Sequence, residues 1–163
     1  MWRGGMSIEI KTPEQIAVMR EAGLVVARTL RVLAAAVRPG ITTAELDAIA
    51  EAEIRAAGAT PSFKGYHGYP ATICNSVNEE IVHGIPSPRR SLRDGDIISV
   101  DCGAIVGGWH GDAAVTLGVG AIAAADAALL EACETALWRG LAQARAGRRL
   151  GDISHAVETS VDR

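Results

Sequence analysis

The strongest constraint on the fold is a possible internal repeat. The helix pattern that ends at Arg38-Pro39-Gly40 resembles the pattern that ends, 107 residues later, at Arg145-Ala146-Gly147. At this offset five further positions match in type: Leu30 with Leu137, Glu45 with Asp152, Leu46 with Ile153, Glu51 with Glu158, and Ile54 with Val161. Each copy has a long helix pattern, a glycine-containing break and a short helix with an acidic start. A duplicated α+β unit would produce this arrangement, and chance similarity between two amphipathic helix pairs is the alternative.

Local patterns predict the elements of each unit. Thr12, Pro13 and Gln15 are typical of a helix start, and the helix should end at Pro39-Gly40. Thr42-Thr43-Ala44-Glu45 opens a second helix that Gly58 ends. Beyond it we expect strands at 71–76, 96–105 and 109–119, a helix at 123–146, and a last helix capped by Asp152. The sequence therefore predicts an α+β fold: one complete helix–helix–strands–hairpin unit followed by the helices of a second. Residues 1–163 are expected to form one domain whose second half is incomplete.

Composition excludes several classes of protein. The 48% hydrophobic and 21% charged content is typical of a globular chain with a sizeable core. A net charge of −3 argues against a DNA-binding surface, and no apolar stretch approaches the ~20 residues of a membrane span. Three cysteines without a CxxC pair favour reduced thiols and a cytoplasmic location. No signal peptide is evident; residues 1–6 are expected to be disordered, and either Met1 or Met6 is the initiator.

Two aspartates in the predicted hairpin are the most informative candidates for chemistry. A turn at Val106-Gly107 would pair residues whose numbers sum to 213, which places Asp101 directly opposite Asp112. Like charges so placed require a shared proton or a cation, and carboxylate oxygens suit divalent metals. Gly103 and Gly111 beside them leave room for a ligand. The alternative is a pair of solvent-facing aspartates at a hairpin edge.

Two carboxylates do not complete a two-metal site, and the histidines offer no tight ligand pair. They lie at positions 67, 83, 110 and 155. His110 is two residues before Asp112 and so shares its strand face, where it can line the same cleft. Spacing alone therefore predicts an incomplete metal site.

Several motifs in succession resemble a known enzyme family. In chain order they are Gly65-Tyr66-His67-Gly68-Tyr69-Pro70, Cys74-Asn75-Ser76-Val77-Asn78-Glu79, His83-Gly84-Ile85-Pro86, and Asp101 with Trp109-His110-Gly111-Asp112. They are similar in order and spacing to the signatures of type I, bacterial methionine aminopeptidases. The resemblance extends from about Ser7 to Arg163.

The resemblance implies a pita-bread fold, in which two pseudosymmetric halves enclose a dinuclear metal centre. This chain would hold the N-terminal half and the helices of the second half. By the family pattern, Asp101 chelates one metal, Asp112 bridges both, and His83 is catalytic and hydrogen-bonds the scissile amide. The substrate-binding residues implied for the methionine pocket and its border are His83, Tyr66, Tyr69, Cys74, Phe63 and His110.

The implied activity is hydrolysis of the first peptide bond of nascent proteins, which removes the initiator methionine through a metal-activated water. The cofactors would be two divalent ions of Co, Mn, Fe(II) or Zn. Members of this family carry three more ligands, a His and two Glu, in the second half. These lie beyond Arg163, so we expect the isolated chain to be inactive and to bind two metals weakly.

The expected partners are nascent N-termini, with the full-length protein a monomer. Arg89, Arg90 and Arg93 form a basic run suited to a transient contact with ribosomal RNA, although a solvated loop is the simpler interpretation. Two alternative functions remain open. One is another pita-bread hydrolase, such as a proline-specific aminopeptidase or a creatinase. The other is a non-catalytic binding protein or degenerate half-fold that retains the architecture.

Overall fold

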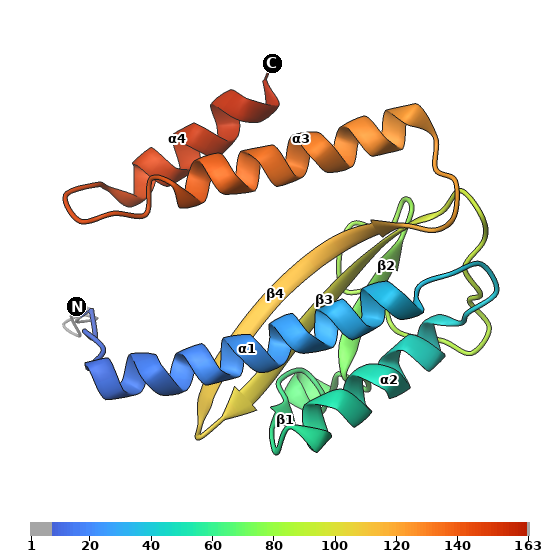
Figure 1. Cartoon of the computed structure of the whole chain (residues 1–163), viewed down its shortest axis with the longest axis horizontal. Helices are drawn as coiled ribbons and strands as arrows, with labels where there is room; N and C mark the ends of the chain where they lie inside the picture. Colours follow the sequence, from blue (N-terminus) through green and yellow to red (C-terminus); the bar gives the residue numbers. More distant parts are fainter. Residues whose placement is uncertain (1–7, 163) are drawn as a thin grey trace, which may run out of the picture.

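The computed structural model describes residues 8–162, which comprise one antiparallel sheet and two helix pairs. Helices α1 (Pro13–Ala36) and α2 (Thr43–Ala56) cover one face of the sheet, and α3 (Ala124–Leu141) and α4 (Leu150–Val161) form a separate pair (Figure 1). The strands are β1 (Thr60–Pro61), β2 (Ile73–Val77), β3 (Ile97–Val106) and β4 (Trp109–Gly118), with a short 3-10 turn, η1, at Tyr66–Gly68. The disorder predicted for residues 1–6 concerns residues that lie outside the described range.

The first two helices begin as the sequence predicts. The Thr12 side chain accepts the backbone N–H of Gln15, whose own side chain accepts the N–H of Thr12. Thr42 and Glu45 form the same reciprocal capping box at the start of α2. These boxes satisfy N–H groups that have no partner within the helix. The buried positions recur every three or four residues, so each helix turns one apolar stripe toward the sheet: Ala22, Val26, Thr29 and Leu33 in α1, and Thr43, Leu46, Ala50 and Ile54 in α2.

Strand β3 is the centre of the sheet, with β1 and β2 along one edge and β4 along the other. Its even-numbered residues from Ile98 to Ala104 are fully buried beneath the helices. Because successive side chains alternate between faces, the odd-numbered residues from Ser99 to Ile105 project from the opposite face. We call this the open face; it carries Asp101.

The hairpin register differs from the one predicted. The pairs of β3 and β4 are Val106 with Trp109 and Gly103 with Asp112, so paired numbers sum to 215 and Asp101 faces Ala114. The expected turn at Val106-Gly107 is wrong because the turn residues are Gly107 and Gly108. Both have positive φ, as a tight two-residue hairpin requires, and valine is poorly suited to that conformation. The shift of two leaves Asp101 and Asp112 on the same face, as diagonal neighbours.

Helices α3 and α4 contact each other through a close crossing at Gly140, where a Cβ atom would lie 2.7 Å from Val157 Cγ2. Helix α3 ends at Leu141, five residues before the predicted end, because the chain tightens into three-residue turns there. Asp152 is not the N-cap: Arg149 is, and Asp152 lies three residues later and accepts the N–H of Arg149 at 2.9 Å. Helices α2 and α4 start 107 residues apart, as the proposed repeat requires.

None of the helices formed by the described residues is long and apolar enough to cross a membrane.

Candidate functional site

The open face of the sheet brings the two predicted metal ligands together. Asp101 is half-buried at the middle of β3, and the exposed Asp112 lies diagonally across on β4. Burial, the negative charge of Asp112 and a hydrogen bond to that carboxyl raise the pKa of Asp101 above its ordinary value. The charge of His83 and the backbone N–H of Cys102 oppose this rise. Two carboxyls in this relation favour either a shared proton or a bound cation.

Because Gly103 has no side chain, Ser62 and Phe63 can pack against it and form one wall of the site. A Cβ atom at Gly103 would lie 2.8 Å from both Phe63 Cε1 and Ser62 Cβ, so only glycine permits this contact. The Phe63 ring therefore lies on the open face beside the carboxylates. Ser62 Oγ is 3.0 Å from His110 Nδ1, which fixes the imidazole on the same face two residues before Asp112. His110 therefore shares a face with Asp112, and its place beside a substrate cleft stays a prediction.

Strand β2 supplies a second wall. Cys74 is paired with Asp101 across the sheet and shares its face. The Tyr69 hydroxyl donates to the carbonyl oxygens of Ile73 at 3.1 Å and Gly84 at 3.2 Å, and it also hydrogen-bonds Cys74. Burial is the main cause that raises the pKa of both the Tyr69 hydroxyl and the Cys74 thiol. The thiol is thus a buried, protonated group rather than a reactive thiolate.

His83 is held beside β2 by its neighbour Gly84. The Gly84 N–H donates to Ser76 Oγ, the Gly84 carbonyl accepts the Asn75 N–H, and any Cβ at Gly84 would overlap the Asn75 carbonyl. His83 itself has a φ of 60°, an uncommon conformation for a side-chain-bearing residue. Its charge lowers the pKa of Asp101, so the imidazole lies within electrostatic reach of that carboxyl.

Among the predicted site residues, Tyr66 has the fewest described contacts with the rest of the site. Its ring is 68% exposed and packs edge-on against His67, with the centroids 4.4 Å apart. Phe63, Cys74 and His110 share the open face with the two aspartates, whereas Tyr66 is mostly exposed.

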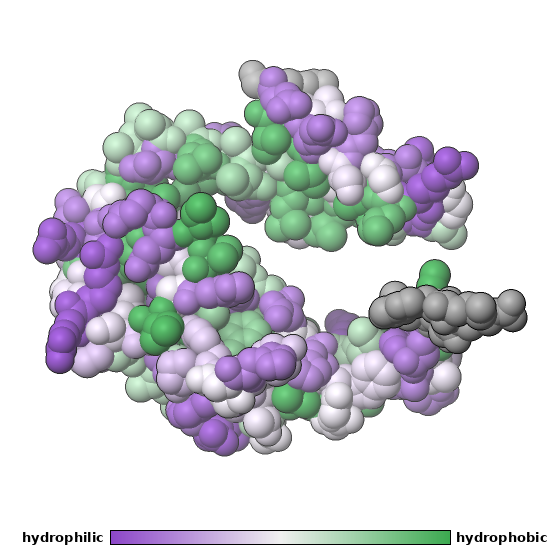
Figure 2. All heavy atoms as spheres, turned by 180° about the vertical axis from the view of Figure 1, so that it is seen from behind, coloured by the Kyte–Doolittle hydropathy of each residue, from purple (hydrophilic) through white to green (hydrophobic). Residues whose placement is uncertain are grey.

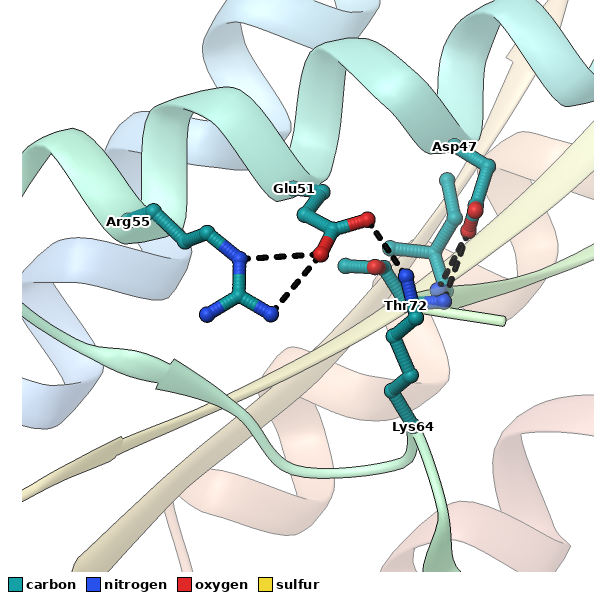
Figure 3. A network of polar contacts seen from close by, with 6 residues as sticks. Asp47, Glu51, Arg55, Lys64 and Thr72 are labelled. Carbon is teal, nitrogen blue, oxygen red and sulfur yellow. Dashed lines mark hydrogen bonds and ion pairs between the residues drawn. The ribbon is translucent and has the colours of Figure 1, made fainter. Parts of the chain in front are cut away.

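Two carboxylates on α2 contribute to the site indirectly, and the sequence interpretation missed them (Figure 3). Asp47 accepts the N–H groups of Thr72 and Ile73 at 2.8 and 2.9 Å. Glu51 accepts from Lys64 at 2.7 Å and from Arg55 at 2.8 Å. Their four-residue spacing on one helix face was visible in the sequence, but their partners 13 to 26 residues away were not.

The donor set for a metal is partial. Among residues 8–162 no group of three or more His, Cys, Asp or Glu side chains is arranged to hold an ion. The two carboxylates provide hard oxygen donors of the kind that divalent ions bind. The described residues thus bring two oxygen donors together, and the metal site stays a prediction.

Comparison with known proteins identifies the family. Residues 17–163 match metallopeptidase family M24. The chain belongs to metallopeptidase family M24. Members of this family are metallopeptidases, which accords with the oxygen donors on the open face.

Curated relatives in the family are named as methionine aminopeptidases. Methionine aminopeptidase 1 of Mycobacterium tuberculosis is 52% identical over 157 residues, covering 96% of this chain and 59% of the relative. The Bacillus subtilis protein of the same name is 54% identical over 152 residues, covering 93% and 61%. The crystal structure of methionine aminopeptidase from Rickettsia prowazekii superimposes with a TM-score of 0.93 at 33% identity, covering 96% of this chain and 62% of that one. The predicted α+β pita-bread architecture is confirmed, and this chain spans about 60% of the length of the relatives it matches.

Proposed function

We propose that this chain supplies the first half of the active site of a methionine aminopeptidase, which hydrolyses the first peptide bond of proteins with an unblocked N-terminal methionine. The observation that carries the proposal is the Asp101–Asp112 pair on an open sheet face, walled by Phe63, Tyr69 and Cys74. The names of the relatives at 52% and 54% identity support the same substrate.

The carboxylates would hold divalent metal. Asp101 would bind one ion and Asp112 would bridge two, with Co, Mn, Fe(II) or Zn as the candidates. A bound divalent ion would act as a Lewis acid toward the scissile carbonyl and would lower the pKa of a water molecule. The raised pKa of Asp101 supports this assignment, because a neighbouring cation is what would relieve the repulsion between the two carboxyls.

The remaining residues of the face would bind and orient the substrate. Phe63, Tyr69 and Cys74 would receive the methionine side chain, since an unbranched thioether adapts to an apolar, partly aromatic pocket. Tyr66 would border the pocket from the rim, and His110 would border it from β4. His83 would donate a hydrogen bond to the scissile amide and stabilise the charge that develops there.

A chimera provides the direct test. In it, this chain is continued by the remainder of the M. tuberculosis relative, and release of methionine from a Met-Gly peptide is measured with added Mn²⁺ or Co²⁺. We expect hydrolysis that chelator abolishes and that fails on the N-acetylated peptide. Asp101→Asn and Asp112→Asn should abolish it, whereas Glu131→Gln on the exposed side of α3 should not. A chimera that folds and loads metal but is inactive would contradict the proposal.

The chain alone gives the second arm of the test. We expect weak Mn²⁺ binding that Asp101→Asn or Asp112→Asn removes, and no turnover. Hydrolysis of the peptide by the isolated chain would show that the partial donor set is sufficient and would overturn the expectation of inactivity.

Cellular context follows from the same proposal. We propose that the protein acts in the cytosol on nascent N-termini as a monomer, with its reduced thiols as the supporting feature. The exposed Arg89, Arg90 and Arg93 are the proposed site of transient ribosome contact. Cosedimentation with ribosomes, compared between the wild-type chain and a triple Arg→Ala variant, tests this assignment.

A further inference from the structure

The segment 62–72 is the least regular part of the site, yet it carries three of the pocket residues. Between β1 and β2 the chain passes through positive φ angles at Gly65, His67 and Gly68. Its internal backbone hydrogen bonds are all local: the Gly65 N–H donates to the Tyr69 carbonyl at 2.8 Å, and the N–H groups of Tyr66, Gly68 and Tyr69 donate to carbonyls three residues back. Hydrogen bonds confined to residues 63–69 fix the shape of the loop, but its position on the sheet depends on contacts with other elements.

Helix α2 provides such contacts near both ends of this loop (Figure 3). At the C-terminal end of the loop, where β2 begins, the Asp47 carboxylate accepts hydrogen bonds from the N–H groups of Thr72 and Ile73. Near its start, Lys64 donates to Glu51 Oε2 at 2.7 Å, and Lys64 directly follows Phe63 in the chain. The two carboxylates lie one helical turn apart, so a single rigid helix face sets both anchor points.

The Glu51 carboxylate is itself held in place. Its other oxygen accepts from Arg55 at 2.8 Å, within the helix. The hydrogen bonds from Lys64 and Arg55 lower the pKa of Glu51, so it is ionised at neutral pH. Arg55 thus orients Glu51 but does not contact the loop through this network, which distinguishes its role from that of Lys64.

We propose that Glu51 and Lys64 are positioning residues: their ion pair holds the loop closed over Cys74 and the carboxylate face, and so sets where Phe63 and Tyr69 stand in the pocket. The functional meaning of this pocket rests on the proposed function above, but closure of the loop does not. If the pair is broken, Asp47 still anchors the distal end and the Ser62 N–H still donates to the Gly103 carbonyl at 2.9 Å, so the loop should open locally between these anchors while the sheet and helices stay folded.

The three cysteines report this opening directly. Cys74 is buried and hydrogen-bonded to Tyr69 of the loop, Cys102 is fully buried between the sheet and the helices, and Cys133 is exposed on α3. Local opening of the loop should raise the alkylation rate of Cys74 alone, whereas loosening of the whole fold should raise the rates of Cys74 and Cys102 together. The exposed Cys133 serves as the internal reference for the reactivity of the alkylating reagent.

The experiment is alkylation of the reduced, metal-free 163-residue chain with iodoacetamide at a fixed pH, followed site by site by mass spectrometry. Glu51 and Lys64 side chains are 25% and 42% exposed, so the pair is a surface pair of moderate strength. Lys64→Ala and Glu51→Ala should each speed Cys74 alkylation by about two- to fivefold. The double variant should be no faster than either single variant, since both remove one shared contact.

Two matched variants separate positioning from general structural effects. Lys64→Arg keeps a long cationic side chain and should restore the slow Cys74 rate. Arg55→Ala removes the other partner of Glu51 and should leave the Cys74 rate within about twofold of wild type. In the chimera, Lys64→Ala should raise KM for the methionyl peptide with kcat little changed.

Distinct outcomes overturn distinct claims. Unchanged Cys74 alkylation in Lys64→Ala, or a parallel rise at Cys102, overturns the positioning role. Selective Cys74 opening together with an inactive but metal-loaded parent chimera leaves the positioning role intact and overturns the proposed function instead.

Discussion

The two helix pairs have related sequence patterns but lie in very different surroundings. The apolar stripes of α1 and α2 are buried against the sheet, and the core cluster extends from Val26 to Val119. In α3 only Ala136 and Gly140 are buried, and no described residue of α4 is. Figure 2 shows the hydrophobic atoms of the α3–α4 pair gathered on the side that faces the rest of the molecule across an open gap. The large apolar residues of these two helices that are exposed are Leu129, Leu137, Trp138, Leu141, Leu150, Val157 and Val161.

This contrast shows that an amphipathic pattern determines which face a helix would bury, but the rest of the fold determines whether it is buried. The stability of the described chain should therefore reside in the first pair and its sheet. The second pair should behave as a weakly coupled unit that opens on its own. The predictions below compare matched positions in the two regions.

The largest difference should come from core truncation. Leu33 in α1 is fully buried, whereas Leu137 in α3 is 53% exposed. Leu33→Ala should lower the free energy of unfolding by about 2–5 kcal/mol, because it removes buried atoms and leaves a cavity. Leu137→Ala should change it by only about 0.5 kcal/mol. Urea denaturation followed by circular dichroism measures both, and similar losses at the two sites would contradict the comparison.

Two glycines test the same contrast at helix contacts. A Cβ atom at Gly111 would lie 2.6 Å from backbone atoms of Ala22 and Gly23, so alanine there must push α1 off the sheet. Gly111→Ala should cost about 3 kcal/mol. At Gly140 the corresponding contact is Val157 Cγ2 at 2.7 Å, on a helix none of whose described residues is buried, so α4 can shift to admit a methyl group.

Gly140→Ala also gains helix propensity, worth about 0.5–1 kcal/mol, so its net effect on the midpoint of thermal unfolding should be small. A larger loss for Gly140→Ala than for Gly111→Ala would mean that α3–α4 packing, rather than the α1–sheet contact, controls stability.

The open face gives a pH-dependent comparison in the metal-free chain. The folded-state pKa of Asp101 is raised above 3.8, chiefly by burial and then by Asp112. Between 3.8 and the folded pKa the native state binds more protons than the unfolded state, so stability falls as pH rises through this window. The penalty is fully present above the folded pKa and absent below 3.8.

Asp101→Asn should therefore stabilise the metal-free chain at pH 7 and lose this advantage as the pH is lowered toward 3.8. Glu131→Gln, at an exposed α3 position, is the control and should show no such dependence. Saturating Mn²⁺ should reverse the order at pH 7, since only the wild-type chain gains from binding. Denaturation midpoints measured from about pH 3.5 to about pH 7.5 check the sign of this effect. Destabilisation of metal-free Asp101→Asn at pH 7 would contradict the prediction.

The sequence predicted the features of the fold that depend on residues close together in the chain. The capping boxes at Thr12 and Thr42, the strand segments and the face carrying Asp101 were all read from local patterns. The hairpin register was missed because a one-residue error in placing the turn shifts every pair by two, and the positive φ of Gly107 and Gly108 decides that placement. The α3 end was missed because Ala142 to Ala146 contains no strong helix breaker, although the chain must turn there for α4 to pack at Gly140.

The candidate site residues could be proposed from the sequence, and their roles stay predictions, whereas the contacts that hold them in place could not be predicted. Asp101, Asp112, His83 and the pocket residues came from motifs that are contiguous in sequence. The anchors depend on side-chain contacts between α2 and the loop, such as Glu51 with Lys64, which have no local signature. The contact of Phe63 with Gly103 across 40 positions is of the same kind, since only the folded sheet brings them together.

The smallest predicted difference concerns the starts of the two short helices. Helix α2 has a full capping box on Thr42, whereas α4 has Arg149 at its N-cap with no side-chain acceptor and keeps only the Asp152 half of the box. Thr42→Ala should lower the global free energy of unfolding by about 1 kcal/mol, because α2 is part of the cooperative core. Arg149→Ser should supply the missing cap and slow amide exchange in the first turn of α4 by a few fold. It should leave the global unfolding midpoint unchanged, because α4 opens without the core. A rise in the global midpoint in Arg149→Ser would show instead that α3–α4 unfolds together with the sheet, and the two regions would then be one cooperative unit.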